Sequence, residues 1–338
     1  MNQAKLQLLY ARAYYDLAAA QSAALVAIGS RLGLYEALAR VPRTLSELAS
    51  VTGVDERYLA PWLANQAASA FITKEAASGR YLLDEEQREI FARPGSPHAL
   101  AAGFALATEL SRYVHEVEAA MRTGRGLPAT AWDDRVHAAI GALDPGKGAR
   151  VLGWLPPDRR SALELGGRAL EIGCGDGELL RALASSFPRS DFVGLDANPK
   201  SIERARAAGK ADDRVRYVVA AAADLPAGPW NLVLTVETLH EVPDPTAVAR
   251  AVHAALGPAG AFFICEPLSS GPEDATPSTR LLSSLELQFC LPASLARGGA
   301  GLGPLAPPDA YLAVLRDAGF SRVHRIEDPG RLVLEAGR

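Results

Sequence analysis

The first third of the chain shows apolar residues at helical spacing, interrupted by helix-start and helix-stop signals. One helical face of residues 1–30 carries only small or apolar side chains: Leu6, Leu9, Ala13, Leu17, Ala20 and Ala24. A short helix is predicted at 33–39. Thr44 and Glu47 have the spacing of a capping box that starts a second short helix, which Gly53 ends. Asp55 then caps a third helix over 56–70.

Two short strands are predicted after these helices, at 71–73 and 80–83. Helices followed by a hairpin have the order of a winged helix, so residues 1–96 are predicted to form a winged-helix-like domain. Pro61 removes a backbone donor inside the third helix, which predicts a kink there or a later helix start. Residues 97–165 contain helical pieces broken by Gly and Pro and no predicted strand, and we interpret them as a linker and lid.

The pattern changes at residue 166, where short apolar strands alternate with amphipathic helices. The predicted strands are 168–172, 191–196, 215–220, 231–236, 260–267, 321–327 and 330–336. Strands joined by helices form a parallel sheet with helices on both faces, so residues 166–338 are predicted to be an α/β domain.

Composition narrows the function classes. Of 338 residues, 49% are hydrophobic and 22% charged, as in a folded soluble protein, and the net charge of −4 argues against a large nucleic-acid footprint. No apolar stretch is long enough to span a membrane, and the N-terminus lacks the pattern of a signal peptide. Cys174, Cys265 and Cys290 are widely spaced, which predicts reduced thiols, a cytoplasmic location and no metal site.

A glycine-rich loop is the strongest candidate for ligand binding. Gly173, Gly175 and Gly177 follow the first predicted strand of the α/β domain and open a helix, where glycines let the backbone approach a ligand closely. Asp196 ends the next strand, 23 residues after Gly173, where an acid can accept both ribose hydroxyls. These positions predict a nucleoside ligand. The spacing is G-x-G-x-G, whereas a dinucleotide site prefers G-x-G-x-x-G.

The motif Glu-x-Gly-Cys-Gly-x-Gly at 171–177, the acid Asp196 and the turn at 224–226 resemble a class I S-adenosylmethionine (SAM)-dependent methyltransferase. With the helical N-terminus and the segments 239–245 and 290–303, the chain resembles bacterial methyltransferases that carry a winged-helix-like N-terminal domain, relatives of small-molecule O-methyltransferases. The resemblance implies a Rossmann-like sheet of seven strands, mostly parallel with the last strand antiparallel. It also implies SAM as cofactor and S-adenosylhomocysteine (SAH) as product.

The resemblance assigns a cofactor role to residues at several strand ends. Those at the methionine end are Glu171, Gly173, Cys174, Gly175 and Gly177, those at the ribose are Asp196 and Ala197, and those at the adenine are Ala222, Ala223 and Asp224. Val236 and Glu237 end the fourth strand and complete the cofactor set. The commoner family pattern has Gly-Asp after the third strand, where this chain has Ala220 and Ala221, so either Asp224 or backbone groups contact the adenine amine.

His240 is the first candidate for a catalytic base. It follows the fourth strand, at the sheet edge where ligands bind, and imidazole accepts protons near neutral pH. Glu241 beside it could orient the ring, and the pair resembles the His-Asp pair that supplies the base in related O-methyltransferases. The structural alternative is that His240 caps the following helix or stacks on the adenosyl group.

The acceptor is predicted to be small and largely apolar, aromatic compounds included, with oxygen favoured over nitrogen as the methylated atom. The candidate substrate residues are Tyr14, His115, Glu237, His240, Phe289 and Cys290. Each has a plain alternative: Tyr14, Phe289 and Cys290 could pack in helices, His115 could be solvated, and Glu237 could touch the cofactor instead.

Two further interpretations concern partners. Residues 1–100 carry ten basic and ten acidic side chains, and the third helix has one Arg and no Lys, so DNA binding is disfavoured. We expect the N-terminal helices to pair with a second copy as a homodimer, with no nucleic-acid or membrane partner. The alternative function is a catalytically inactive, cofactor-binding sensor or transcriptional regulator that acts through its winged helix.

Overall fold

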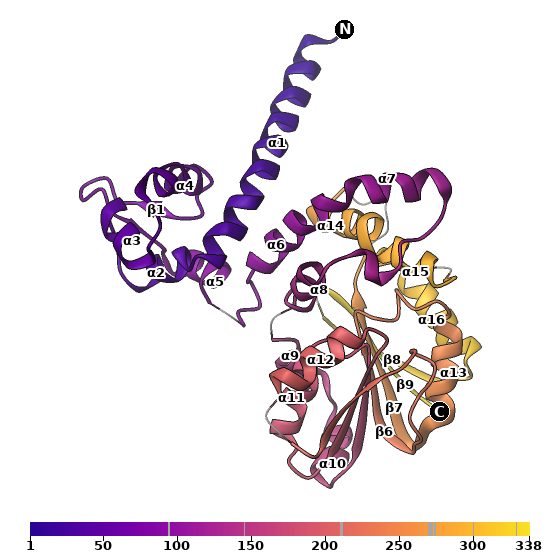
Figure 1. Cartoon of the computed structure of the whole chain (residues 1–338). Coiled ribbons are helices and arrows are strands. Elements are labelled where there is room, and N and C mark those ends of the chain that lie inside the picture. Colours follow the sequence, from indigo (N-terminus) through magenta and orange to yellow (C-terminus); the bar gives the residue numbers. More distant parts are fainter. Residues whose placement is uncertain are drawn as a thin grey trace. The chain divides into compact units, whose positions relative to one another are not determined.

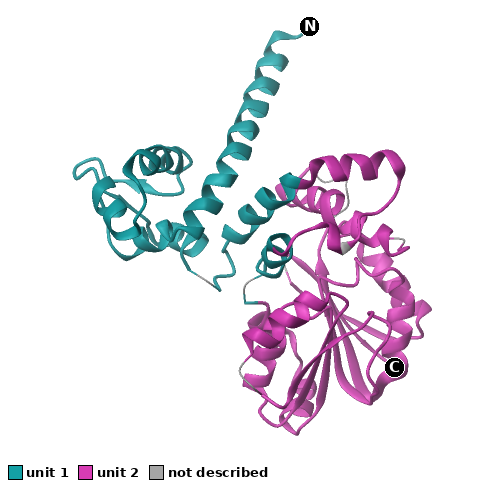
Figure 2. Ribbon diagram, in the orientation of Figure 1, with its two compact units in different colours: residues 1–112, 135–146 teal, residues 113–134, 147–338 magenta. Residues whose placement is uncertain are grey.

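The computed structural model describes residues 1–93, 95–144, 146–209, 212–269, 273, 275–299, 301–328 and 330–338. The chain forms two compact units (Figure 2): residues 1–112 with 135–146, and residues 113–134 with 147–338. The predicted linker segment 97–165 is divided between these units, and its role as a lid stays a prediction. Its described residues form helices and turns without a strand, as expected.

The first unit is mainly helical and contains one small hairpin. Its helices are α1 (Gln3–Arg31), α2 (Leu34–Arg40), α3 (Leu45–Thr52), α4 (Glu56–Ala68), α5 (Glu85–Phe91), α6 (Ala101–Leu110) and most of α8 (Asp134–Gly141). The hairpin pairs β1 (Thr73–Lys74) with β2 (Tyr81–Leu82) in antiparallel fashion. The predicted order of helices followed by a hairpin is confirmed.

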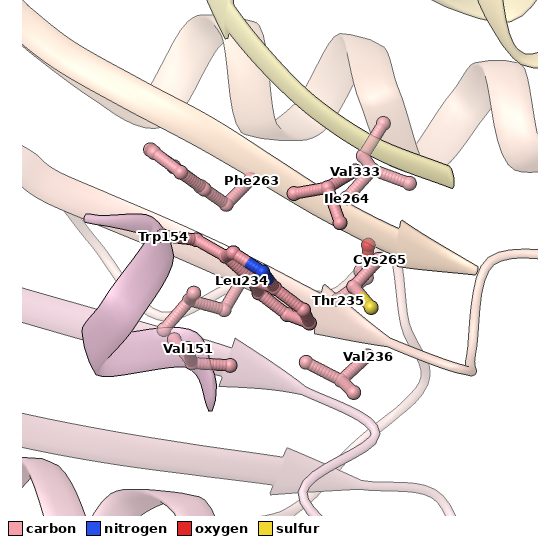
Figure 3. A pocket seen from close by; sticks show the side chains of 9 residues that line it. All are labelled: Val151, Trp154, Leu234, Thr235, Val236, Phe263, Ile264, Cys265 and Val333. Atoms are coloured by element: carbon pink, nitrogen blue, oxygen red, sulfur yellow. The ribbon is translucent and has the colours of Figure 1, made fainter. Parts of the chain in front are cut away.

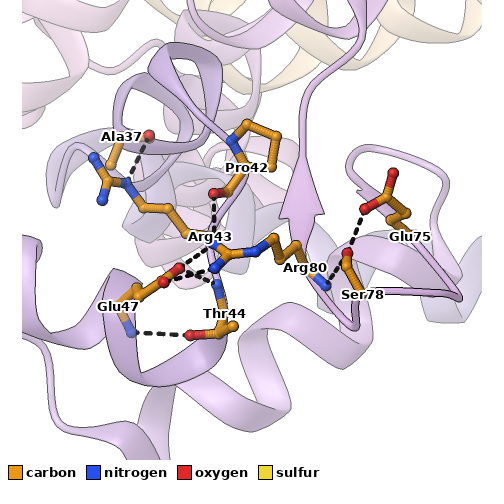
Figure 4. Close-up of polar contacts among 8 residues, drawn as sticks. All are labelled: Ala37, Pro42, Arg43, Thr44, Glu47, Glu75, Ser78 and Arg80. Atoms are coloured by element: carbon orange, nitrogen blue, oxygen red, sulfur yellow. Dashed lines mark hydrogen bonds and ion pairs between the residues drawn. The ribbon is translucent and has the colours of Figure 1, made fainter.

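Local polar contacts fix the helix starts in this unit (Figure 4). Thr44 and Glu47 form the predicted capping box at α3, whose C-terminus is the left-handed residue Gly53. The guanidinium of Arg80, just before β2, donates to both carboxylate oxygens of Glu47 and to the Pro42 carbonyl. This Arg80 contact ties the hairpin to the α3 start.

Pro61 does not delay the start of α4. The helix begins at Glu56, with the Asp55 side chain accepting from the Arg57 amide, and it runs through Pro61 to Ala68. The alternative of a start beyond the proline is therefore wrong. The cap and the burial of Leu59 and Trp62 support the helix at Pro61, which cannot donate a backbone hydrogen bond.

Helix α1 has two different halves. Its buried residues are Ser22, Val26, Ala27 and Gly29, and a Cβ on Gly29 would lie 2.4 Å from the Trp62 ring. The preceding part of α1 is almost wholly exposed, including Leu8 (74%) and Tyr15 (74%). No single described helix is long and apolar enough to cross a bilayer; α1 and α2 meet that length-and-composition test only as a pair bent by 67°.

A seven-stranded sheet forms the centre of the second unit (Figure 1). The strands are β3 (Arg168–Ile172), β4 (Asp191–Asp196), β5 (Val215–Val219), β6 (Trp230–Val236), β7 (Leu256–Pro267), β8 (Arg322–Ile326) and β9 (Arg331–Gly337). Their order is β5-β4-β3-β6-β7-β9-β8, and only β9 runs antiparallel to its neighbours. The predicted Rossmann-like sheet with an antiparallel last strand is confirmed.

Helices cover both faces of this sheet. The helical elements are α7 (Val114–Thr123), η2 (Ala129–Ala131), α9 (Lys147–Trp154), α10 (Pro157–Glu164), α11 (Glu178–Ser186), α12 (Pro199–Ala208), α13 (Pro245–Ala255), α14 (Pro277–Leu285), η3 (Glu286–Cys290), α15 (Leu291–Ala296) and α16 (Pro308–Asp317). One buried cluster joins the sheet to α9 and α11, and another joins it to α13 and α16. The η3 segment is a π-helix inserted between α14 and α15. The parallel strands all end at one edge, where the candidate residues gather.

Candidate active site

The glycine loop follows β3 and is held by the neighbouring strand. Gly173, Gly175 and Gly177 adopt left-handed φ values of 74°, 53° and 71°. A Cβ on Gly173 would lie 2.3 Å from the Thr238 hydroxyl oxygen and one on Gly177 would lie 2.4 Å from the Tyr217 hydroxyl oxygen, so both positions need glycine. Apart from its two chain neighbours, no described residue comes within 4 Å of the corresponding point on Gly175, which leaves open space beside the loop.

Asp196 joins this loop to the end of β4. Its Oδ2 accepts from the Gly175 amide at 3.0 Å, and its Oδ1 accepts from the Asn198 amide at 2.8 Å. Burial raises the pKa of Asp196, although the hydrogen bonds from these two backbone amides oppose the shift. Each oxygen keeps a further lone pair, so the carboxylate suits a pair of vicinal hydroxyls such as those of ribose. Ala197, the next residue, is exposed.

Glu171 is a buried carboxyl group within β3. Its side chain is fully buried, and neither carboxylate oxygen has a hydrogen-bond partner among the described residues. Burial raises the pKa of Glu171 to about 8, and the charge of Lys147 opposes that shift. Because an unpaired buried carboxylate is unfavourable, this group fits a ligand that brings an ammonium, as the methionine end of SAM does.

Cys174 lies inside the glycine loop and is fully buried. Burial raises the pKa of its thiol far above the ordinary range, so the thiol stays protonated and neutral. Its small side chain fits beside Gly194, where a Cβ would lie 2.8 Å from the sulfur. Cys174 therefore shapes the loop and is not placed as a nucleophile.

The remaining predicted cofactor residues lie at the ends of β5 and β6. Ala222 is half-buried, Ala223 and Asp224 are exposed, and the Asp224 amide bonds to the Ala221 carbonyl in a turn. Glu237, directly after β6, has a left-handed φ of 50° and forms an ion pair with Arg331 of β9. Glu237 therefore already has a partner within the protein, and its predicted ligand contacts stay a prediction.

A small cavity lies between α9 and strands β6, β7 and β9 (Figure 3). Its volume is about 10 Å³, at the limit for one water molecule. The hydroxyl of Thr235, which lines it, has no hydrogen-bond partner among the described residues. Val236 also lines this cavity, so its side chain points into the helix–sheet interface. The cavity is too small for a methyl acceptor.

His240 lies four residues after β6 and is 4% exposed. Its Nδ1 is 2.5 Å from Oε2 of Glu266, a fully buried carboxylate near the end of β7. The other oxygen of Glu266 accepts from the amides of Thr238, at 3.2 Å, and Leu239, at 2.7 Å. Glu266 therefore holds both the imidazole and the backbone that carries it.

Glu241 also lies beside the ring, and its predicted role in orienting His240 stays a prediction. Oε1 of Glu241 lies 3.7 Å from Nε2, on the other side of the ring from Glu266. The Glu241 amide bonds to the Thr238 carbonyl in a tight turn, so its side chain and that of His240 leave the same turn. The carboxylate at Nδ1 is that of Glu266, which comes from the adjacent parallel strand β7.

The protonation of His240 follows from these neighbours. Burial lowers the pKa of the imidazole, but the charge of Glu266 and hydrogen bonds with Cys290, Glu241 and Glu266 outweigh it and raise the pKa well above 6.5. Burial raises the pKa of the Cys290 thiol to about 11. The ring is therefore a stronger base than free imidazole.

The π-helix η3 supplies the apolar side of the site. Phe289 and Cys290 are buried, and the Phe289 ring lies 4.8 Å from the Trp132 ring between centroids. The Trp132 indole nitrogen has no hydrogen-bond partner among the described residues. Glu286, at the start of η3, has a pKa raised by burial, and the charge of His240 opposes that shift.

Two other predicted acceptor residues are not brought into this cluster. His115 is exposed on α7, and Tyr14 is 63% exposed on α1, with its ring stacked on Tyr10 at 6.1 Å between centroids. Their roles in acceptor binding stay predictions.

Sequence reasoning missed Glu266. The signal was available, because Glu266 ends the apolar run 261–265 of the strand next to β6. An acid after that strand is expected beside the end of β6. Trp132 and Arg331 carried no such signal, since their place depends on how distant segments pack.

Comparison with known families agrees with this geometry. Residues 137–325 match the model described as a methyltransferase domain, and residues 20–93 match an Rv2258c-like winged HTH domain. The chain therefore belongs to the methyltransferase-domain family. The prediction of a class I SAM-dependent methyltransferase with a winged-helix N-terminal domain is confirmed, as is SAM as its cofactor.

Three known proteins illustrate what the chain is similar to. A ubiquinone biosynthesis O-methyltransferase from Bordetella avium is 30% identical over 159 residues, 46% of this chain and 62% of that relative. The structure of the mitomycin 7-O-methyltransferase MmcR is 19% identical, with a TM-score of 0.70 and 99% of both chains covered. Human N-acetylserotonin methyltransferase, solved with SAM, is 16% identical, with a TM-score of 0.73 over 99% of this chain and 98% of that one.

Proposed function

We propose that this enzyme methylates an oxygen of a small, largely apolar acceptor and that His240 is the general base. The observation that carries the proposal is the buried imidazole at the sheet edge, with Nδ1 held by Glu266 and Nε2 directed away from it. A hydroxyl must lose its proton as it is methylated, whereas an amine that is already neutral needs no base. The O-methyltransferases among the relatives support the choice of oxygen.

When bound, SAM supplies an activated methyl group on a sulfonium centre. Glu171 would hold the ammonium at the methionine end, the loop at 173–177 would follow the donor chain, and Asp196 would accept the ribose hydroxyls. Ala222, Ala223 and Asp224 would flank the adenine. These assignments rest on the unpaired carboxylate of Glu171, the open space at Gly175 and the remaining lone pairs of Asp196.

The protein's part in the reaction is alignment and proton removal. Nε2 of neutral His240 accepts the hydroxyl proton of the acceptor, and the resulting imidazolium is stabilised by the buried carboxylate of Glu266. Phe289 and Cys290 offer an apolar surface beside the base, suited to an aromatic or alicyclic ring. Because the pKa of His240 is raised, the base form is populated at higher pH than in free imidazole.

The enzyme is further proposed to act as a homodimer in the cytoplasm. The exposed N-terminal half of α1, with Leu8, Leu9 and Tyr15, is the surface that supports pairing with a second copy. All three cysteines are unpaired and buried, as in a reducing compartment. The alternative of an inactive sensor or transcriptional regulator is not favoured, because the methyltransferase family match covers most of the second unit.

A screen with isotopically labelled SAM tests the proposed activity. Phenols and the matching anilines would be offered at equal concentration, and products detected by mass. Methylation of phenols, abolished in His240→Ala while SAH still binds, supports the proposal. Methylation confined to the anilines, or unaffected by His240→Ala, contradicts it.

A further inference from the structure

Three side chains of metal-binding type converge on one point of the acceptor site. One ligand atom of each of His240, Glu241 and Cys290 lies within 4.8 Å of the other two. The imidazole and the thiol are buried, and the Glu241 carboxylate is 26% exposed. His240 and Glu241 are neighbours, but Cys290 comes 50 positions after His240, which is why no metal pattern is visible in the sequence.

The separations suit a four-coordinate ion. Zinc bonds to nitrogen, oxygen and sulfur of about 2.0–2.3 Å imply ligand–ligand distances of about 3.3–3.7 Å in a tetrahedral site. Nε2 of His240 and Oε1 of Glu241 are already 3.7 Å apart. The sulfur of Cys290 lies within 4.8 Å of both atoms, so the three groups offer three ligands of a tetrahedral site and leave one position open.

A second, independent observation concerns Glu266. A histidine that binds a metal through Nε2 normally donates its Nδ1–H to a carboxylate, which fixes the tautomer and directs the Nε2 lone pair at the ion. Glu266 makes that contact with His240 at 2.5 Å, and it is itself anchored by two backbone amides. The cluster thus has three candidate ligands and, in Glu266, a carboxylate that orients the ligand His240.

We propose that Nε2 of His240, the carboxylate of Glu241 and Sγ of Cys290 bind a Zn²⁺-type cation, which switches off the base. Sulfur and imidazole ligands select zinc or cobalt over magnesium or calcium. Binding displaces to solvent the thiol proton of Cys290 and, where the ring is protonated, the Nε2 proton of His240, and the thiolate and carboxylate then offset the charge of the ion. The metal occupies the lone pair that would accept the acceptor's proton, so this inhibitory effect rests on the proposed function.

Direct binding is tested with the full-length enzyme and no acceptor. Co²⁺ serves as a spectroscopic probe, because a cobalt–thiolate bond gives a near-ultraviolet charge-transfer band. We expect this band at one equivalent per chain, displaced by Zn²⁺. Cys290→Ser should abolish the band and lower Zn²⁺ affinity at least tenfold, whereas Cys265→Ser, which removes another buried thiol, should preserve both.

Two further variants guard against misfolding as an explanation. Glu241→Gln alters a partly exposed ligand and should weaken Zn²⁺ binding, and Glu266→Gln should weaken it about 10–100-fold through the outer contact. Circular dichroism would verify the fold of each variant. Absence of the charge-transfer band in the native enzyme, or an equal band in Cys290→Ser, overturns the site.

Inhibition is measured separately, as the ratio of turnover with and without Zn²⁺ for each variant. We expect Zn²⁺ to inhibit native enzyme competitively with the acceptor, a chelator to reverse this, and Cys290→Ser to require at least tenfold more Zn²⁺. Metal binding without inhibition overturns the proposed switch. If the metal binds but His240→Ala retains native turnover, the metal site stands and the base assignment fails.

Discussion

Nδ1 of His240 lies 2.5 Å from Oε2 of Glu266, and the two residues come from the ends of adjacent parallel strands. The contact is fully buried, so the carboxylate acts on the ring with little screening by water. It makes Glu266 the positioning residue of the site, although neither the motif around His240 nor its neighbour Glu241 indicates this.

Glu266→Gln tests that relationship. Losing the carboxylate removes the charge that raises the pKa of His240, so the alkaline rise in turnover should shift to lower pH, and turnover should fall at least tenfold. A pH profile of turnover and a calorimetric titration with SAH would measure both effects. Unchanged SAH affinity together with a shifted alkaline rise in turnover is the result expected if Glu266 positions His240. An alkaline rise that does not shift would show that Glu266 does not act on the base.

Glu171 should make cofactor binding depend on pH. Its pKa is raised to about 8, so below that pH the carboxyl group is protonated before binding and must release its proton to pair with the cofactor's ammonium. SAH affinity should therefore rise between pH 6 and 8, by up to about tenfold per unit. Calorimetry in buffers of different ionisation enthalpy would report the proton released.

The matched control for that experiment is Glu171→Gln, which keeps the size of the side chain and removes its titration. Its SAH affinity should be weaker at pH 8 and flat with pH. A pH dependence that survives in this variant would assign the effect to another group.

Asp196→Ala should remove two hydrogen bonds to the ribose, each worth roughly 1.5–3 kcal/mol before compensation. It also removes the acceptor of the hydrogen bonds that the Gly175 and Asn198 amides donate in the native protein. We expect at least a tenfold loss of SAH affinity by calorimetry. Asp224→Ala, at an exposed turn, is the comparison: affinity close to native there would leave the adenine contact to backbone groups.

The N-terminal half of α1 should be needed for pairing but not for folding of the first unit. Ser22 is the first buried residue of α1, so removal of residues 1–18 leaves the packing of Val26 and Ala27 in place. We expect a monomer by light scattering, with the unfolding temperature of the remaining chain measurable by circular dichroism. A truncated chain that is still dimeric would move the interface elsewhere.

Sequence patterns predicted the elements that have strong local signals. The capping box at Thr44, the left-handed Gly53 and the strand–glycine–helix order around Gly173 all depend on contacts within a few residues. The antiparallel position of β9 was available only from family resemblance, because β9 pairs with β7, more than 60 residues earlier.

Tertiary contacts account for what the sequence missed. The ion pair of Glu237 with Arg331 of β9 had no signal in the sequence, and the predicted ligand contacts of Glu237 stay a prediction. Glu241 was expected to orient His240, and it lies near Nε2, but the sequence did not indicate that Glu266 holds Nδ1. The π-helix at Glu286–Cys290 interrupts a helical pattern that reads as continuous, and Cys290 at its end lies near His240.

The pH dependence of His240→Ala tests whether His240 removes the acceptor's proton. With a phenolic acceptor, native turnover should rise with pH through a limb above 6.5, since the pKa of the ring is raised and only the neutral ring accepts a proton. His240→Ala should bind SAH normally, lose roughly 10²–10⁴ in turnover at neutral pH and recover as the phenol ionises. Turnover of the variant within about threefold of native, with the same rise with pH, would contradict the role of His240 as the base and leave catalysis to alignment alone.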